Sequence, residues 1–456
     1  MSKHYHLIGI GGIGVGTLAS LFLDDGFDIS GSDIKENDMT KILKKKGADV
    51  YIGHKASNIS NPNCVICSSA ISQDNPEIVE AKRKNILIVK RGQALAELVQ
   101  IRIASVVVGA HGKTTTSALV AHILSEGGLD PAAAIGGVVK NGEYSGLSGK
   151  GKHFVVEADE SDGSFLYFFP KYAIITNVDF EHVDFYQNWD NLIKAYAQFI
   201  DQIDLKGHLF YCGDDSVLRS LAREFKGQKT SYGFDNGNDI FADQITCSGF
   251  QSKFCCIARG EKQGEVQLNI PGRHNVYNAL AAIGLALQLG VCFQSIQKSL
   301  ESFKGVQRRF SYLGDFKGIS IVDDYAHHPK EIFSTIEAAK TFDKKRIFVV
   351  FQPHRYSRTR YFKDDFVDVL KECDQLVITD IYSASEKDQQ QITPDMICED
   401  INRIKADLAV YKKYDEIISY VLKNVLPGDL VLFLGAGDIN RLAGELAGQL
   451  NKEESF

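Results

Sequence analysis

The stretch Ser105–Thr116, SVVVGAHGKTTT, decides the fold expected for this 456-residue chain. Its apolar run Val106–Val108 predicts a buried strand, and Gly109-Ala110-His111-Gly112 then forms a loop ahead of Lys113-Thr114-Thr115 and a helix over 116–124. Backbone N–H groups at a helix N-terminus favour phosphate, a lysine adds charge, and a threonine hydroxyl can reach Mg²⁺. The first glycine of the ordinary phosphate-loop motif is a valine here. A glycine turn alone is often only a tight connection, but Gly-Lys-Thr at this junction predicts ATP binding.

A second glycine loop lies near the start of the chain. A short strand over 5–10 leads into Gly9-Ile10-Gly11-Gly12-Ile13-Gly14, which fits G-x-G-x-x-G, and a helix follows through Phe22. After another strand over 27–30 comes Asp33, about 20 residues beyond the loop, where a ribose-binding acid is expected. The pattern predicts a βαβ unit with a diphosphate or dinucleotide loop. It is more specific for the fold than for the ligand.

The composition limits the class of protein. Hydrophobic residues make up 44% and charged residues 24%, as in soluble globular proteins. The net charge of −7 gives no electrostatic reason to expect nucleic acid or an anionic membrane as a partner. Nine cysteines without zinc-like spacing predict reduced core thiols. The apolar run 7–23 contains five glycines and precedes no small-residue cleavage site, so we expect a cytoplasmic protein rather than a secreted one.

Strand-like and helix-like runs alternate along the chain. The clearest strands are expected at 65–67, 86–89, 154–158, 172–176, 319–322, 346–351, 375–379 and 430–434, and helices at 93–102, 195–203 and 275–290. The polar run 227–264 predicts an antiparallel excursion at a sheet edge. The alternation predicts three α/β domains with mainly parallel sheets, at 1–103, 104–304 and 305–456. The first and third are expected to be Rossmann-like, and the middle one to resemble phosphate-loop ATPases.

Two strand ends in the middle domain release clusters of acidic residues. The first is VVEADESD at 155–162, and the second is ITNVDFEHVD at 175–184, which adds His182. Carboxyl ends of parallel strands border the ligand crevice, and carboxylates there can hold Mg²⁺ beside a triphosphate. Most acidic clusters are solvated turns, and a lone histidine is usually structural. Two such ends after a Gly-Lys-Thr loop favour a divalent-metal site.

Four further motifs carry polar side chains suited to anionic ligands. They are PGRHNVYN at 271–278, GVQRRF at 305–310, DDYAHHP at 323–329 and FQPHRYSRTR at 351–360. Asn275 or Asn278 can cap a helix or read an adenine edge, and the residues alone do not choose between these roles. The arginines suit phosphate or carboxylate. A surface basic cluster is the simpler interpretation, but the buried strand that precedes 351–360 favours a crevice. Adjacent histidines at 327–328 are a weak metal site because neighbouring side chains diverge.

Together these features predict ATP, one or two Mg²⁺ ions, a diphosphate-bearing substrate and a second anionic substrate. That set fits ATP-driven ligation, in which a carboxylate becomes an acyl phosphate and an amine then attacks it. Catalysis of this kind is mostly positioning and neutralisation of charge.

The chain resembles the Mur ligases of peptidoglycan synthesis nearly from end to end. The motifs that carry the resemblance are GIGGIG, SGSD, SSAIS, GAHGKTTT, EADESDGSF, TNVDFEH, PGRHNVYNALAA, GVQRRF, DDYAHHP, FQPHRYSRTR and LGAGDI. The resemblance implies ATP-dependent joining of L-alanine to the lactyl carboxylate of UDP-N-acetylmuramate. It further implies that the first domain holds this nucleotide sugar, the second holds ATP, and the third closes over both.

The resemblance also implies roles for single residues. Those expected at ATP are Gly109, Ala110, His111, Gly112, Lys113, Thr114, Thr115, Asn275, Asn278, Arg309 and Asp324. Those expected at the other substrates are Gly9, Gly11, Gly12, Gly14, Asp33, Ser69, Tyr325, His354, Arg355 and Arg358. Mg²⁺ is expected on Thr114, Glu157 and His182, and catalytic roles on Lys113, His182, Arg309, His354, Arg355 and Arg358. The N-terminal glycine loop then faces the UDP diphosphate and binds no NAD.

Small departures and alternatives remain. The family's GTHGKT is GAHGKT here, its Met-Ser-Gly after the first loop is Val15-Gly16-Thr17, and no lysine has the spacing of the carbamylated lysine of some relatives. A recycling ligase that attaches a ready-made tripeptide is the nearest alternative, and FQPHRYSRTR favours the single amino acid. An NAD-dependent oxidoreductase or a non-catalytic nucleotide-binding protein leaves the Lys113 loop or the metal set without a use. A monomer or homodimer is expected.

Overall fold

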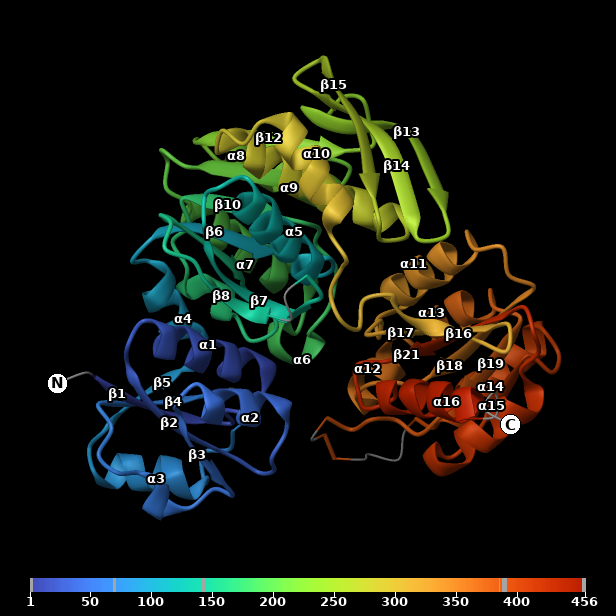
Figure 1. Cartoon of the computed structure of the whole chain (residues 1–456), viewed down its shortest axis with the longest axis horizontal. Helices are drawn as coiled ribbons and strands as arrows, with labels where there is room; N and C mark the ends of the chain where they lie inside the picture. The colour runs from blue at the N-terminus through green and yellow to red at the C-terminus, as the bar shows by residue number, and fades with distance from the viewer. Residues whose placement is uncertain (1–2, 69–70, 142–143, 385, 388–391, 453–456) are drawn as a thin grey trace. The chain divides into compact units, whose positions relative to one another are not determined.

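The computed structural model describes residues 3–68, 71–141, 144–384, 386–387 and 392–452. Two compact units divide the chain. The first unit comprises residues 1–244, 254–267 and 276–304, and the second comprises 245–253, 268–275 and 305–456. Three sheets organise the described residues, two of them chiefly in the first unit and one in the second (Figure 1). The predicted three-domain α/β fold with mainly parallel sheets is confirmed.

The N-terminal sheet is wholly parallel, with strand order β3-β2-β1-β4-β5. Its elements are β1 (His4–Ile8), α1 (Ile13–Asp24), β2 (Asp28–Asp33), α2 (Asp38–Lys45), β3 (Asp49–Ile52), η1 (Ala56–Asn58), β4 (Cys64–Cys67), α3 (Pro76–Arg83), β5 (Leu87–Lys90) and α4 (Arg91–Val99). The strand order reverses between β1 and β4, and right-handed crossovers then require helices on both faces. Figure 1 shows α1 and α3 on opposite sides of the strands. The loop after β1 therefore lies at the switch point, where ligands bind in such sheets.

The central sheet has ten strands in the order β15-β14-β13-β12-β11-β10-β6-β9-β7-β8. Its strands are β6 (Ile103–Val108), β7 (Ala132–Val139), β8 (Tyr144–Ser148), β9 (His153–Glu157), β10 (Tyr172–Ile175), β11 (His208–Cys212), β12 (Gln228–Gly233), β13 (Ile240–Ser248), β14 (Gln251–Ala258) and β15 (Glu261–Leu268). Its helices are α5 (Lys113–Glu126), η2 (Ser164–Tyr167), α6 (Val183–Tyr186), α7 (Trp189–Asp201), α8 (Ser216–Glu224), α9 (Arg273–Gln288) and α10 (Phe293–Ser302). Strand β6 lies between β9 and β10 and is parallel to both. Three neighbouring strands thus end at one edge of the sheet.

Several predicted elements are corrected by the structure. Residues 228–233 do not begin an antiparallel excursion. The chain crosses over from β11 through helix α8, and the next strand, β12, then pairs with β11 in parallel. Strands β13, β14 and β15 do lie at the sheet edge, joined by two-residue connections. Helix α7 begins six residues before the predicted start, where Asn188 accepts a hydrogen bond from the Asn191 N–H. The sequence does not predict β7 or β8, because β7 is rich in alanine and glycine, β8 is rich in serine, and neither shows a clear β-branched pattern.

The sheet of the second unit has the order β16-β17-β21-β18-β19-β20, with only β16 antiparallel. Its strands are β16 (Ser311–Phe316), β17 (Ile319–Asp324), β18 (Arg346–Phe351), β19 (Gln375–Ile378), β20 (Ala409–Tyr411) and β21 (Asp429–Leu434). Its helices are α11 (Pro329–Ala339), α12 (Tyr356–Tyr361), α13 (Lys363–Leu370), α14 (Pro394–Ile404), η3 (Tyr414–Glu416), α15 (Ile417–Asn424) and α16 (Asn440–Lys452). Alternate residues of β18 enter opposite cores: Phe351 packs with Phe366, and Phe348 packs with Phe433.

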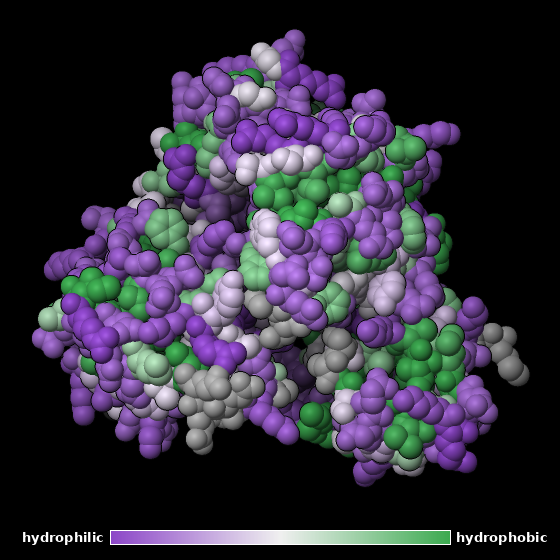
Figure 2. All heavy atoms as spheres, turned by 180° about the vertical axis from the view of Figure 1, so that it is seen from behind, coloured by the Kyte–Doolittle hydropathy of each residue, from purple (hydrophilic) through white to green (hydrophobic). Residues whose placement is uncertain are grey.

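The nine cysteines are all free thiols, and seven of them are buried. Burial raises the pKa of the Cys64 thiol to about 11, so its C-x-x-C pair with Cys67 is a core feature. On the face drawn in Figure 2, hydrophilic side chains cover most of the surface, and hydrophobic ones form separate patches. Within the described ranges, the helices are all too short or too polar to cross a membrane.

Candidate active site

The loop between β6 and α5 requires glycine at two positions. Gly109 has φ +133° and Gly112, the N-cap of α5, has φ +81°. Residues that carry a side chain rarely adopt these backbone angles. A Cβ added at Gly109 would collide with the Thr176 hydroxyl, and one at Gly112 would collide with the Asn278 amide. Helix α5 begins at Lys113, three residues before the predicted start. Lys113, Thr114 and Thr115 therefore occupy the first helical turn, where N–H groups are available to an anion.

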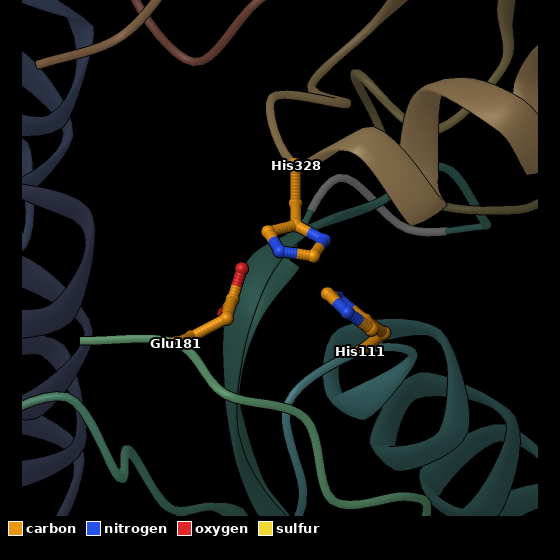
Figure 3. Close-up of side chains that lie close together, drawn as sticks. All are labelled: His111, Glu181 and His328. Atoms are coloured by element: carbon orange, nitrogen blue, oxygen red, sulfur yellow. The ribbon is translucent and has the colours of Figure 1, made fainter. Parts of the chain in front are cut away.

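The end of β10 holds this loop in place. The His111 N–H donates to Asn177 Oδ1 at 2.9 Å, and Asn177 Nδ2 donates back to the His111 carbonyl at 3.0 Å. The Thr176 hydroxyl also donates to that carbonyl, at 2.6 Å. The His111 ring nitrogen Nε2 lies 3.0 Å from Asp179 Oδ2. Figure 3 shows His111 at the N-terminal end of α5, with Glu181 on the loop that follows β10. These hydrogen bonds between side chains after β10 and the His111 residue fix the shape of the loop.

Lys113 lies across the loop toward a buried carboxylate. Its Nζ donates to the Gly109 and Ala110 carbonyls at 2.6 and 3.0 Å and lies 2.9 Å from Glu160 Oε2. Burial alone lowers the pKa of Lys113, but the carboxylates of Glu160, Asp159 and Glu157 outweigh it and raise that pKa. The same charge lowers the pKa of Asp159 against the effect of its burial. The ammonium is therefore charged and lies at the helix start.

Thr114 and Glu157 meet beside Lys113. The Thr114 hydroxyl donates to Glu157 Oε1 at 2.9 Å, and the Gly136 N–H donates to Oε2 at 2.7 Å. A Cβ at Gly136 would lie 2.6 Å from Glu157 Oε1, so a larger residue there would displace the carboxylate from this position. A hydroxyl and a carboxylate at the start of a phosphate-loop helix are oxygen donors of the kind Mg²⁺ prefers.

His182 joins two carboxylates that the sequence analysis did not single out. Its Nε2 lies 3.4 Å from Glu160 Oε1 and 3.6 Å from Glu181 Oε2. One ligand atom from each of these three residues lies within 4.8 Å of the others, so the group can hold a cation. The predicted set of Thr114, Glu157 and His182 is thus arranged as two neighbouring groups. The acid-rich strand ends were the signal, but spacing alone does not tell which carboxylates turn inward.

The two asparagines of α9 have different contacts. Asn278 Oδ1 accepts a hydrogen bond from the Thr116 hydroxyl at 3.1 Å, which ties α9 to α5. Asn275 Nδ2 donates to the Pro271 carbonyl at 2.7 Å. Helix α9 begins at Arg273, two residues before the predicted start, so neither asparagine is its N-cap.

The N-terminal glycine loop is held by the end of β2. The Gly9 and Ile10 N–H groups donate to the Ser32 carbonyl at 2.8 and 3.0 Å, and the Gly11 N–H donates to Asp33 Oδ2 at 2.8 Å. Gly9 has φ +82°, and Gly12 is the N-cap of α1. A Cβ at Gly14 would lie 3.1 Å from Nη1 of Arg91, a cation that the sequence analysis missed. Ser69, also predicted at the substrate, lies outside the described residues.

Asp324 and Arg309 lie close together in the second unit. Asp324 is buried and accepts hydrogen bonds from the N–H groups of Phe310 and Ala326 at 2.9 and 2.8 Å. Its carboxylate therefore holds the turn that carries Arg309. The Arg309 guanidinium lies 5.2 Å from the centre of the Tyr325 ring and 3.8 Å from Glu331 Oε1.

The motif after β18 gathers His354, Arg355 and Arg358. His354 Nδ1 lies 3.3 Å from Arg358 Nη1, and burial, Arg358 and Arg355 lower the pKa of His354 to about 3. Arg355 has φ +69°, a strained value for a side-chain-bearing residue. Tyr382 was missed by the sequence analysis: its ring stacks on His354 with centroids 5.6 Å apart, and its carbonyl accepts the Arg355 N–H at 2.8 Å. The histidine is neutral here, and the cluster is cationic through its arginines.

Three family models cover most of the chain. They are the "Mur ligase family, catalytic domain" over residues 4–102, the "Mur ligase middle domain" over 107–286, and the "Mur ligase, glutamate ligase domain" over 308–437. This chain belongs to the Mur ligase family.

Particular relatives carry more specific names. The UDP-N-acetylmuramate–L-alanine ligase of Aquifex aeolicus is 43% identical over 453 residues, 99% of each chain. The crystal structure of UDP-N-acetylmuramate-alanine ligase from Thermotoga maritima has a TM-score of 0.85 and 30% identity, covering 99% of this chain and 100% of that one. A murein peptide ligase from Psychrobacter arcticus, with a TM-score of 0.74 and 24% identity over 98% and 99% of the two chains, shares the fold.

Proposed function

We propose that this chain joins L-alanine to the lactyl carboxylate of UDP-N-acetylmuramate, with cleavage of ATP to ADP and phosphate. The observation that carries the proposal is the placement of Lys113 and Thr114 in the first turn of α5, against Glu160 and Glu157 from the neighbouring strand end. The choice of substrates is supported by relatives of that name at about 40% identity over nearly the whole chain.

In this proposal the loop Gly109–Gly112 and Lys113 bind the β and γ phosphates of ATP. Thr114 and Glu157 would hold Mg²⁺, and His182 with Glu160 would serve a second cation, because these oxygen and nitrogen donors lie beside the same helix start. Bound Mg²⁺ would neutralise phosphate charge as the γ-phosphoryl group leaves. Adenine is proposed to contact Asn275 and Asn278, the ribose to contact Asp324, and the γ-phosphate to contact Arg309.

The proposed reaction has two steps. The lactyl carboxylate attacks the γ-phosphorus, which forms an acyl phosphate and releases ADP. The amine of L-alanine then attacks the acyl carbon, an amide bond forms, phosphate departs, and the nitrogen loses a proton. Arg355 and Arg358 are proposed to bind the carboxylates, since guanidinium groups pair with them in a bidentate manner. A pKa of about 3 makes His354 a hydrogen-bond partner rather than a cation at neutral pH.

In this scheme each predicted domain carries the main site of one ligand, and Arg309 and Asp324 of the third domain are proposed to contact ATP as well. Residues 1–103 are proposed to bind the UDP sugar through Gly9–Gly14 and Asp33, residues 104–304 to bind ATP, and residues 305–456 to bind L-alanine through the His354 motif and Tyr325. The diphosphate assignment is supported by the glycine loop at the switch point and by Arg91 beside Gly14. A cytoplasmic site of action is part of the proposal, since nucleotide precursors are its substrates.

Phosphate release from ATP and Mg²⁺ tests the proposal most directly. The protein is supplied with UDP-N-acetylmuramate and, in parallel, with L-alanine or with the tripeptide L-alanyl-γ-D-glutamyl-meso-diaminopimelate. Release that depends on L-alanine is the expected result. Release only with the tripeptide would assign the recycling reaction instead, and no release with either would contradict a catalytic role.

A further inference from the structure

Glu77 is a buried charged residue that the proposed chemistry does not use. It occupies the first turn of α3 and has no exposed surface. Its carboxylate stabilises that helix start, but a solvated acid would do the same without the cost of burial. Replacing a buried ion by apolar residues is often neutral or stabilising, so stability alone does not account for an acid at this position.

Both carboxylate oxygens of Glu77 are bound by the chain. Oε2 accepts a hydrogen bond from the Ser32 hydroxyl at 2.5 Å, and Oε1 accepts one from Asn58 Nδ2 at 2.5 Å and one from the Lys55 N–H at 3.3 Å. The imidazoles of His6 and His54 each place a nitrogen 3.5 Å from Oε2. These partners come from β1, β2 and the segment after β3. One carboxylate therefore links the middle of β1, the end of β2 and the segment that follows β3.

Two of these partners, Ser32 and Asn58, are connected to the glycine loop by hydrogen bonds. The Ser32 carbonyl accepts the N–H groups of Gly9 and Ile10, and the next residue, Asp33, accepts the N–H of Gly11. On the other side, Asn58 Nδ2 also donates to the Gly53 carbonyl at 3.1 Å, and the Gly53 N–H donates to the Asp33 carbonyl at 2.7 Å. Through Ser32 on one side and Asn58 on the other, Glu77 thus fixes the end of β2, to which the loop 9–14 is hydrogen-bonded.

The surroundings keep the carboxylate ionised. Burial by itself raises the pKa of Glu77, but the nearby His6 imidazole and the hydrogen bonds from Ser32 and Asn58 lower it below its ordinary value. An ionised acceptor makes stronger hydrogen bonds than a neutral one, so the hold on Ser32 is firmer than an amide would give.

We propose that Glu77 is a positioning residue for the UDP-N-acetylmuramate loop Gly9–Gly14, acting through the Ser32 hydroxyl and carbonyl. The inference rests on the proposed function, because it takes the nucleotide sugar to bind at this loop. The residue touches no reacting atom. Its effect is to fix the N–H groups of the loop in the orientation that the diphosphate requires, before the ligand arrives.

The test compares Glu77→Gln with Glu80→Gln in the phosphate-release assay. Glu80 lies one turn further along α3 and pairs with Arg83 and Lys84. We expect Glu77→Gln to raise the KM for UDP-N-acetylmuramate about tenfold, because a charge-assisted hydrogen bond is weakened. The KM for ATP and the kcat at saturation should stay at wild-type values, and Glu80→Gln should change none of the three.

Ser32→Ala is the second variant, and it removes the linking hydroxyl while the buried carboxylate keeps Asn58. A raised KM for the nucleotide sugar in this variant supports the proposal even if Glu77→Gln fails to fold. Unchanged KM values in a folded Glu77→Gln protein, or in Ser32→Ala where the first variant does not fold, would overturn it. A general loss of kcat and of ATP affinity would overturn it too, since that pattern indicates a structural role. Wild-type protein that releases no phosphate would instead overturn the proposed function, and this inference with it.

Discussion

The two glycine loops of the first unit make an informative comparison. Each follows a parallel strand and precedes a helix, and each has N–H groups that donate hydrogen bonds to the end of a neighbouring strand. The loop 9–14 contains no cation, and the nearest carboxylate, Asp33, accepts an N–H of the loop itself. The loop 109–112 runs into Lys113 and Thr114, each bound to a carboxylate of the adjacent strand end.

The difference shows that a glycine loop sets the position of N–H groups and nothing more. The chemistry possible at such a loop depends on the charged side chains that lie beside it. Beside 109–112 the start of α5 supplies a lysine and a hydroxyl, and the neighbouring strand ends supply several carboxylates, which suits phosphoryl transfer. Beside 9–14 the carboxylate of Asp33 accepts an N–H of the loop and so holds the chain in place, which suits binding of a ligand without reaction. The following changes test this contrast, beginning with the largest expected effect.

Lys113→Ala should lower kcat by roughly 10³-fold, because a fixed charge at the transferring phosphoryl group is lost. The measurement is L-alanine-dependent phosphate release, with circular dichroism to verify the fold. Lys171→Ala is the matched control, since Lys171 pairs with Asp204 on the surface. Near-normal turnover in Lys113→Ala would contradict the view that the loop 109–112 serves catalysis whereas the loop 9–14 serves only binding.

Glu157→Gln should lower the apparent affinity for Mg²⁺ by about 100-fold, because a charged oxygen ligand is replaced by a neutral one. Phosphate release is titrated with Mg²⁺ at saturating ATP. Glu126→Gln, at the exposed end of the same helix α5, should leave the titration unchanged. Equal Mg²⁺ dependence in the two variants would exclude Glu157 as a ligand.

A third junction in the second unit offers a pH-dependent contrast. His274 follows Gly272, whose φ is +93°, and burial and Arg309 lower the pKa of His274 to about 4 despite Glu331. The unfolded chain has the higher histidine pKa, near 6.5, so it binds the extra proton below that pH. Stability should therefore fall by about 3 kcal/mol as pH drops from about 6.5 to about 4. Urea unfolding measures this fall, and His274→Gln should flatten it; an identical slope in the variant would contradict the assignment.

Asp33→Ala should raise the KM for UDP-N-acetylmuramate about five- to tenfold, because the Gly11 N–H loses its acceptor and the loop loosens. The KM for ATP should not change. Initial rates at varied concentrations of each substrate separate the two values, and Asp25→Ala at the end of α1 serves as control. A change in the ATP value of equal size would mean that the loops are not independent.

Ser145→Ala should have the smallest effect. The Thr17 hydroxyl donates to Ser145 Oγ at 2.7 Å and joins α1, behind the first loop, to β8 of the central sheet. Its loss should lower the free energy of unfolding by about 1 kcal/mol. Thermal unfolding measures this, and the KM values of both nucleotides should remain those of the wild type. A shifted KM would show that the link transmits more than stability.

Local patterns predicted more of the fold than of the site. Strands such as β6 and β18 are buried on both faces and stand out as β-branched and aromatic runs, whereas β7 and β8 are small-residue strands and were missed. The loop 109–112 and the acid-rich ends after β9 and β10 were predicted because glycine, lysine and carboxylates are conspicuous in sequence. The sequence did not predict which side chains are partners. The grouping of Glu160 and Glu181 with His182 is visible only in the contacts of the folded chain.

The sequence by itself determined the alternation of strands and helices, the two glycine loops and the positions of the acidic and basic motifs, because these depend on neighbours within a few residues. The tertiary structure decided which of them meet. Lys113 and Glu160 are 47 residues apart, and Ser32 and Glu77 are 45 apart, yet each pair is in hydrogen-bond contact. Parallel pairing brings distant strand ends to one edge, and burial then requires each charge there to find a partner. Spacing along the chain carries neither piece of information.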